Sequence, residues 1–209
     1  MDTGITVTGT GQATAPADLL RLTLSVGQDA PDVADAVAQV AERTDAVKAA
    51  LLAEGVASDD VATSSVSVHP QYGDQMTVTG YRASHSMIVT TTDLTGFGRL
   101  LNAAVAAVGN SLGLDFLQFD VKDKAALVDQ ARQLAFQQAR QKAEQLAALT
   151  GQSIGGIAGV SETQGYVPLR RDMAAKAVGL SAGGFSPEMG VTPGEQSIDV
   201  TLEVRWNWA

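Results

Sequence analysis

The stretch that most constrains the fold runs from Lys122 to Gly151 and is typical of one long, uninterrupted helix. Small side chains recur at every fourth position, at Ala131, Ala135, Ala139, Ala143 and Ala147. This spacing departs from the 3.5-residue period of a coiled coil and drifts round the helix by about 40° per step. A ridge of small side chains also lets a helix approach a flat surface closely. We therefore expect this helix to lie on a β-sheet rather than to form a coiled-coil rod.

Composition narrows the class of protein. The 209 residues are 45% hydrophobic and 18% charged, which is typical of a folded globular chain rather than a disordered one. The net charge of −9 disfavours nucleic acid and anionic membrane surfaces as partners. The absence of cysteine excludes thiol catalysis, disulfides and Cys-based zinc sites. No run of about twenty apolar residues is present, so we expect no transmembrane segment.

The start of the chain bears on its compartment. Strand-like alternation begins at Ile5 and leaves no room for the apolar core of a signal peptide. We therefore expect a cytoplasmic protein if the sequence is complete. If a signal peptide was trimmed, the same sequence fits a periplasmic or extracellular protein.

Hydrophobic periodicity predicts an α+β fold with the element order ββ-α-ββ-α-β-α-β-β. The first two strands, 5–11 and 20–26, are expected to form a hairpin. The remaining strands are expected at 61–68, 76–92, 114–121, 153–162 and 196–208, and the remaining helices at 33–54, 93–108 and 122–151. The glycines near the start of the strand 153–162 indicate a bulge or close packing there.

The helix expected at 33–54 follows a capping signal at Asp29–Asp32 and stops at Gly55. Its apolar stripe is predicted to consist of Val33, Val37, Val40, Val47 and Leu51.

The final strand alternates cleanly, with Trp206 and Trp208 on its apolar face. Burial is the simplest interpretation of these two indoles. Tryptophan is also enriched in subunit interfaces, so Trp206 and Trp208 are candidate interface residues as well. Both alternatives stay open at this point.

The segment 163–194, between the last two expected strands, is rich in glycine and proline. A structureless loop of that length is improbable inside a compact domain. We therefore expect a mobile or interface-forming insertion in a single domain that spans 1–209. Its candidate interface residues are Arg170, Arg171, Met173, Phe185 and Met189.

Two features are typical of cofactor or metal sites, but neither has the neighbouring structure or the spacing that such a site requires. Gly9-Thr10-Gly11 resembles the start of a dinucleotide fingerprint, but a second strand follows instead of a helix, so we interpret the glycines as strand bulges. His69 and His85 lack metal-ligand spacing, and His85 shares an apolar strand face. We therefore expect no cofactor and no metal.

No catalytic residue stands out. The sequence has no G-x-S-x-G elbow, and Asp59, Asp60, Asp120 and Asp123 look like solvated carboxylates at helix starts or in loops. A hydrolase would need a pocket that joins His69 or His85 to a serine and a carboxylate. We expect a protein that is not an enzyme.

Four segments resemble a known family. Residues 61–72 look like its T-x-x-x-x-v-x-P-x-Y strand, and residues 80–83 resemble its GY-x-A strand. The helix 131–151 is similar to its A-x3-A-x3-A-x2-KA-x2-LA-x3-G signature, and residues 193–195 resemble its closing PGE. The chain thus resembles the SIMPL-domain family from Ile5 to Trp206. That family was long catalogued as a domain of unknown function. It includes bacterial periplasmic immunogenic and oxidative-stress-related proteins, and a mammalian adaptor linked to a receptor-associated kinase.

The resemblance implies a SIMPL fold and assembly into large ring- or channel-like homo-oligomers, without established catalytic residues. Our leading hypothesis is a non-enzymatic, self-assembling protein with a structural or stress-protective role. The first alternative is a protein-interaction adaptor that uses the 163–194 arm, and the second is an undetected hydrolase.

Overall fold

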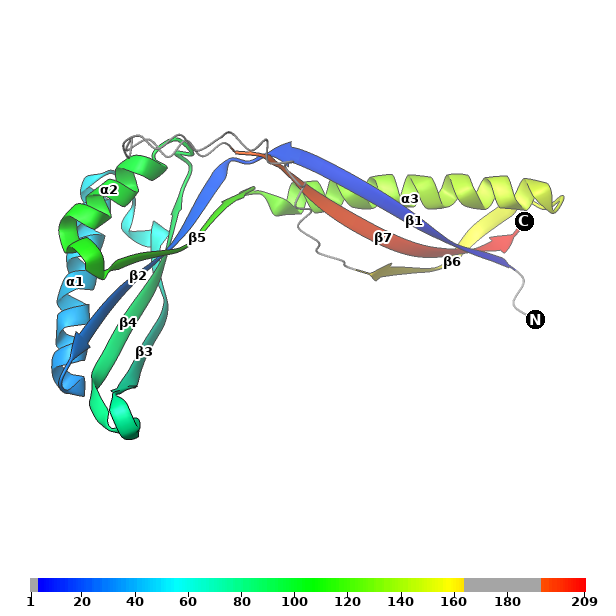
Figure 1. Cartoon of the computed structure of the whole chain (residues 1–209). Helices are drawn as coiled ribbons and strands as arrows, with labels where there is room; N and C mark the ends of the chain where they lie inside the picture. Colours follow the sequence, from blue (N-terminus) through cyan, green and yellow to red (C-terminus); the bar gives the residue numbers. More distant parts are fainter. Residues whose placement is uncertain (1–3, 164–192) are drawn as a thin grey trace, which may run out of the picture. The chain divides into compact units, whose positions relative to one another are not determined.

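The computed structural model describes residues 4–163 and 193–209. The fold is α+β, with antiparallel sheets and with the helices and strands in the order that the sequence predicts. The described residues form two compact units, each with its own sheet (Figure 1). We call them the three-stranded unit, built from 4–17, 121–163 and 194–209, and the four-stranded unit, built from 18–120.

The three-stranded unit consists of one sheet and one long helix. Its strands are β1 (Gly4–Pro16), β6 (Ile154–Thr163) and β7 (Glu195–Trp208), in the order β1-β7-β6. The helix α3 (Lys124–Leu149) runs along the sheet in Figure 1. The core lies between them and is formed mainly by the helix alanines and by the alternate apolar residues of β7, namely Ile198, Val200, Leu202, Val204 and Trp206.

The alanine ridge is buried as the sequence predicts, and it packs on β1. A Cβ atom built on Gly9 would lie 2.6 Å from the backbone nitrogen of Ala139 and 2.7 Å from its Cβ. Gly11 meets the helix backbone at Ala131 and Ala135 in the same way. β1 pairs with β7 without any shift of register, so the interpretation of these glycines as bulges is wrong. They allow the helix to touch the strand.

The four-stranded unit has the strand order β3-β4-β2-β5, with two helices packed on one face. The strands are β2 (Leu19–Ala30), β3 (Val61–Tyr72), β4 (Val78–Thr91) and β5 (Leu112–Asp120). The helices are α1 (Val33–Ala53) and α2 (Phe97–Val108), and short 3-10 turns lie at Ser58–Asp60, Asp74–Met76 and Gly109–Ser111.

The expected hairpin of the first two strands is wrong. β1 pairs with β7, whereas β2 pairs with β4 and β5 in the other unit. Alternating hydrophobicity identifies a strand without naming its partner, and strands that are neighbours in sequence usually pair. Here Ala17 and Asp18 mark the boundary between the units.

Helix α1 begins after Asp32, whose side chain accepts a hydrogen bond from the backbone N–H of Asp35 (2.9 Å). Its predicted apolar stripe is only partly correct, because Val33 and Val37 are 43% and 42% exposed. The buried stripe consists of Ala36, Val40, Thr44, Val47 and Leu51. Two of these are small or polar residues, which a search for large hydrophobic side chains overlooks.

Candidate functional site

The outer margin of β6 carries two exposed apolar side chains on the sheet of the three-stranded unit. β6 pairs with β7 on one side, and within the described residues no strand pairs with its other side. Ile157 and Val160 are 52% and 55% exposed. Their β7 partners, Trp206 and Val204, are buried beneath α3. The β6 apolar pair, Ile157 and Val160, therefore lies on the helix side of the sheet, beyond the area that α3 covers.

The opposite margin of the same sheet, along β1, is covered by side chains from α3. The backbone N–H of Thr10 donates to Oε1 of Gln138 (2.8 Å), and Nζ of Lys142 donates to the backbone oxygen of Thr8 (3.0 Å). These backbone groups would otherwise be available to a further strand. Among the described residues, the sheet therefore has one edge that α3 side chains partly block, at β1, and one edge that no strand pairs with, at β6, which we call the open edge.

The β6 strand is irregular in its first half. Its register with β7 shifts between Ile154 and Ile157 and again between Ile157 and Gly159, which confirms the bulge predicted at the glycines. The second half is tied to α3, because Arg132 forms a bidentate contact with Glu162 at 2.8 and 3.1 Å. This contact fixes the strand while leaving its outer margin exposed.

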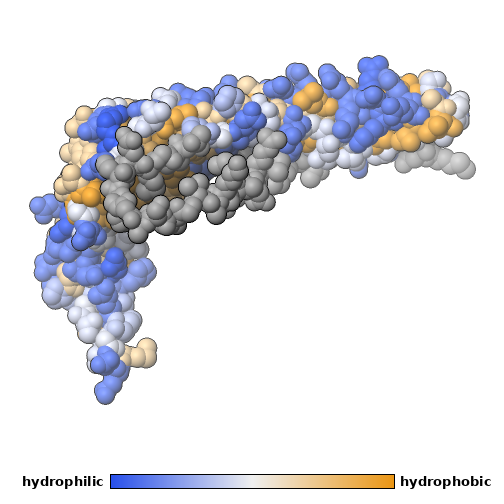
Figure 2. Space-filling model, turned by 45° about the horizontal axis from the view of Figure 1, so that its top comes forward, coloured by the Kyte–Doolittle hydropathy of each residue, from blue (hydrophilic) through white to orange (hydrophobic). Residues whose placement is uncertain are grey.

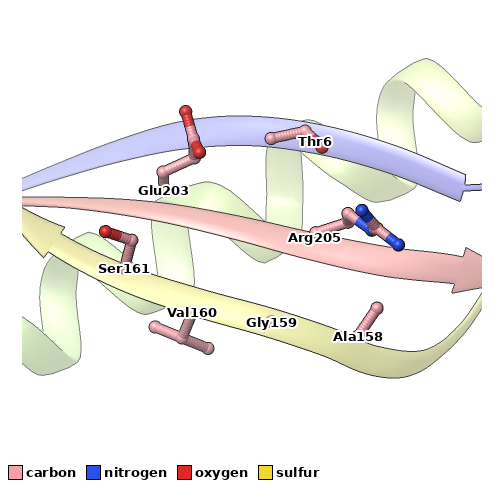
Figure 3. A pocket seen from close by; sticks show the side chains of 7 residues that line it. All are labelled: Thr6, Ala158, Gly159, Val160, Ser161, Glu203 and Arg205. Carbon is pink, nitrogen blue, oxygen red and sulfur yellow. The ribbon is translucent and has the colours of Figure 1, made fainter.

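A hollow of about 390 Å³ lies on the face of the sheet away from α3 (Figure 3). It is lined by Thr6, Ala158, Gly159, Val160, Ser161, Glu203 and Arg205. In Figure 3 Ser161, Glu203 and Arg205 project from the same side of the sheet, while Val160 points the other way. The lining contains two hydroxyls, of Thr6 and Ser161, and two exposed charges of opposite sign but no histidine. This lining suits the binding of a polar group better than nucleophilic catalysis, which needs a base beside the nucleophile.

His85 is half-buried on β4, as its apolar neighbours predict, whereas His69 is exposed. Nε2 of His85 lies 3.0 Å from Oγ1 of Thr63, the one hydrogen bond that the described part of the chain gives this ring. Burial lowers the pKa of His85, Lys48 lowers it further, and Asp45 opposes the change. The ring is therefore neutral at pH 7. It meets a threonine hydroxyl, but not the serine and hydrogen-bonded carboxylate that the hydrolase alternative requires.

The expectation of solvated carboxylates is wrong for Asp120. This residue is only 3% exposed at the end of β5, and its backbone oxygen accepts a hydrogen bond from the N–H of Asp18 (3.1 Å). Asp123 has a structural role, because its side chain caps α3 by accepting from the N–H of Ala126 (3.1 Å).

The candidate interface residues fall into two groups. Arg170, Arg171, Met173, Phe185 and Met189 lie outside the described residues. Trp206 is buried, with its ring centroid 6.3 Å from that of Phe136, so this indole is used inside the fold. Trp208 is half-buried at the end of β7, and an interface role for it stays a prediction.

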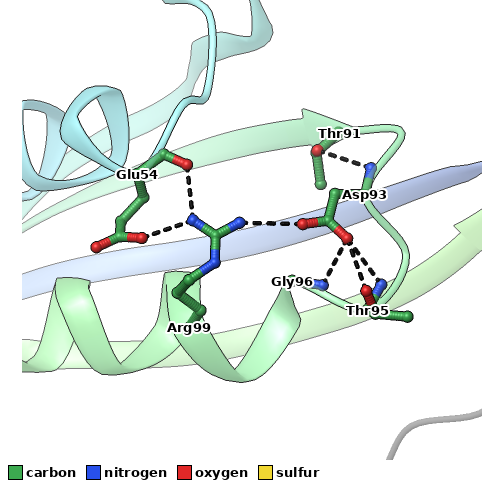
Figure 4. A network of polar contacts seen from close by, with 6 residues as sticks. All are labelled: Glu54, Thr91, Asp93, Thr95, Gly96 and Arg99. Carbon is green, nitrogen blue, oxygen red and sulfur yellow. Dashed lines mark hydrogen bonds and ion pairs between the residues drawn. The ribbon is translucent and has the colours of Figure 1, made fainter.

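A polar network joins the C-terminal end of α1 to the start of α2 (Figure 4). Asp93 accepts hydrogen bonds from the Thr95 hydroxyl (2.9 Å) and from the backbone N–H of Gly96 (2.9 Å). Arg99 donates to Asp93 (3.0 Å) and to both the side chain (2.6 Å) and the backbone oxygen (2.8 Å) of Glu54. The Thr95 hydrogen bond, followed by Arg99 and backbone N–H groups, lowers the pKa of Asp93 although partial burial opposes this. These contacts define a polar cluster that holds the turn before α2.

The Asp93→Asn substitution is expected to destabilise the four-stranded unit by about 1 kcal/mol at pH 7, because it weakens the charged hydrogen bonds in the turn before α2 and removes the ion pair with Arg99. The folded state lowers the pKa of Asp93 below its ordinary value of 3.8, so its stabilisation is present above that pH and is lost as the pH falls through the folded pKa. The difference between wild type and variant should therefore shrink in acid. Urea unfolding at pH 7 and pH 3, followed by circular dichroism, measures it.

The control for this prediction is Asp59→Asn, an exposed carboxylate in the same unit for which the structure gives no hydrogen bond. It should unfold like the wild type at both pH values. An Asp93→Asn variant as stable as the wild type at pH 7 would contradict a stabilising role for the cluster.

Within residues 4–163 and 193–209, no group of three or more His, Asp or Glu side chains is placed to hold a metal ion. In the same part of the chain, none of the helices combines the length and the apolar character that crossing a bilayer requires.

The fold defines an α+β protein with two antiparallel sheets, and no other described strand pairs with the outer side of β6, the edge strand of one of them. The chain belongs to the SIMPL family, described as a protein of unknown function (DUF541), whose model matches residues 5–206. The matched residues include parts of both compact units.

Two similar proteins come from bacteria. The 26 kDa periplasmic immunogenic protein of Brucella melitensis is 28% identical over 96% of this chain and 82% of its own length. The uncharacterized protein YggE of Edwardsiella ictaluri is 29% identical over 73% of this chain and 65% of its own. A crystal structure of AtUAH in complex with glyoxylate covers 61% of this chain and 34% of its own, at 16% identity. Its TM-score of 0.25 is too low to indicate a shared fold.

Sequence reasoning did not single out Ile157 and Val160. Their alternation places them on a strand, but the signal that would identify them is the position of that strand at a sheet edge. Strand order depends on pairing between distant segments, so a single sequence does not reveal it.

Proposed function

We propose that this chain is a non-enzymatic SIMPL protein that self-assembles into a large ring- or channel-like homo-oligomer with a structural or stress-protective role. The observation that carries the proposal is the open β6 edge. An unpaired strand with exposed apolar side chains is a template for pairing with another chain, and stable proteins usually protect such edges. In the described part of this chain, α3 side chains bond to backbone groups of the β1 edge, whereas no strand pairs with the outer side of β6.

A ring also needs a second contact surface on each copy, because a single self-complementary surface stops at a dimer. The tip of the β3–β4 hairpin offers one. Tyr72, Met76 and Val78 are each more than half exposed there, and Gln75 and Met76 adopt positive φ angles of 58° and 60°. Non-glycine residues rarely adopt this conformation.

Hydrophobic residues also interrupt the hydrophilic surface in Figure 2, at the end of the three-stranded unit where α3 stops. Leu149, the last residue of α3, is 82% exposed. Apolar side chains at several separate places on the surface support assembly through more than one contact.

Relatives named as periplasmic proteins support a periplasmic location for this chain as part of the proposal. A fusion to a reporter that is active only in the periplasm tests this location.

The mass in solution tests the proposal directly. Size exclusion coupled to light scattering at micromolar concentration should give a particle several times the 21.6 kDa of one chain. Dilution should lower the mass in steps, since assembly depends on protein concentration. A strict monomer throughout the series would contradict self-assembly.

The two alternatives make different predictions. The adaptor depends on 163–194, most of which lies outside the described residues, and deletion of 164–192 should then abolish partner capture while assembly persists. The hydrolase depends on His85, and His85→Ala should then abolish a hydrolytic activity that the wild type displays.

A further inference from the structure

We propose that β6 pairs antiparallel with β6 of a second copy, about a two-fold axis between Ala158 and Gly159. This inference rests on the proposed self-assembly and names the surface and the partner. The sheet of each copy would then continue into the sheet of the other through its open edge. The outer margins of the joined sheet are then the two β1 edges, where Gln138 and Lys142 bond to backbone groups. Strand pairing through β6 therefore joins two copies and adds no third.

The β6 sequence is self-complementary in this register. Antiparallel pairing about that axis places Ile157 opposite Val160 of the second copy, and the reverse. Both side chains lie on the helix side of the sheet, because they pair with the buried Trp206 and Val204 of β7. Directly opposed residues share a face and touch. One contact would therefore bury two Ile–Val pairs that are now half-exposed.

The bulge in β6 is compatible with this register. Ile157 and Val160 fall on the same face only because the irregularity between Ile157 and Gly159 inserts one extra residue. Both copies carry the same bulge, so each strand has two residues, 158 and 159, between its two apolar side chains. Ile157 and Val160 of one copy can therefore both lie opposite their partners in the other. The bulges lie opposite one another at the axis.

Charge also permits this pairing. Glu162 is the only charged residue of β6, and it is held by Arg132 of α3. In the proposed register it lies opposite Gly155 of the second copy, so no like charges oppose each other. A second copy is favoured as the partner because its own Ile157 and Val160 have the same spacing as the side chains that they would meet. An unrelated strand would need apolar side chains at that same spacing.

Disulfide trapping tests the register, and a chain without cysteine makes the result simple to interpret. Ile157→Cys and Val160→Cys variants, one of them carrying a size tag, are mixed and oxidised. The mixed disulfide should exceed by several-fold the homodimers that either variant forms alone, because only opposed positions bring the Cβ atoms within disulfide reach. A Thr8→Cys variant on the β1 edge is the control and should give little product.

A charge variant tests the surface. Val160→Lys should lower the particle mass at least two-fold, because a lysine on an edge strand opposes pairing. Thr8→Lys should leave the mass unchanged. Tryptophan fluorescence and circular dichroism establish that both variants are folded, which the exposure of Val160 favours.

The outcomes separate this inference from the proposed function. A wild-type monomer overturns both. An assembled wild type without preferential mixed disulfide, or with its mass unaffected by Val160→Lys, overturns the β6 pairing alone and transfers assembly to another surface. Preferential trapping together with the mass loss supports the inference.

Discussion

Replacing Gly9 by valine is expected to destabilise the three-stranded unit by roughly 3 kcal/mol, the upper part of the range for overpacking. A Cβ at this position would collide with the backbone of α3 at Ala135 and Ala139. Backbone atoms inside a regular helix cannot move independently, so the whole helix would have to lift from β1. The burial of the alanine ridge would be lost along with this contact.

Tryptophan fluorescence during urea unfolding measures this effect in the three-stranded unit. The chain has two tryptophans, and both lie on β7 in that unit. The control is Gly156→Ala on β6, where an added Cβ has no heavy atom within 4 Å outside its chain neighbours. The control should unfold at nearly the wild-type midpoint. An unchanged midpoint for Gly9→Val would mean that α3 does not contact β1 as closely as described.

Ala139→Leu is expected to cost about 3 kcal/mol for a related reason, because it adds a large side chain to a filled contact. Ala139 is fully buried, and its Cβ faces the position where Gly9 lacks one. Leucine is an excellent helix former, so a loss of stability cannot come from helix propensity. The change tests packing between the helix and the sheet alone.

The matched control for this variant is Gln141→Leu on the exposed side of α3. It introduces the same side chain into the same helix without meeting β1, and it should leave the unfolding midpoint close to that of the wild type. Equal effects from Ala139→Leu and Gln141→Leu would contradict a close contact. In that case the four-residue alanine spacing would have no packing role.

The short-range pattern of apolar residues was sufficient to predict most of the helices and strands. The alternation of β7 and the four-residue ridge of α3 depend only on residues close together in sequence, and both are where the sequence predicts them. The wrong predictions concern residues whose contacts come from segments distant in sequence. Gly9 and Gly11 look like bulges until the helix that touches them is known, and Asp120 looks solvated until its strand is placed in a sheet.

The candidate surface was harder to predict than the fold. Trp206 and Trp208 attract attention in the sequence because of their size, yet Trp206 is used to fill the core against Phe136. Ile157 and Val160 are ordinary strand residues. Their exposure follows from the width of α3, which covers β1 and β7 and leaves β6 beyond it.

The amino-acid order alone therefore established the α+β class, the sequence of helices and strands, and membership of the SIMPL family, since each depends on short-range periodicity or on motifs. The folded chain decided that β1 pairs with β7 rather than with β2, and that β6 lies at the edge of the sheet formed by the described strands. The reason is physical. A strand's hydrogen-bonding groups are the same whatever its sequence, so the partner and the free edge are set by how the distant segments pack together.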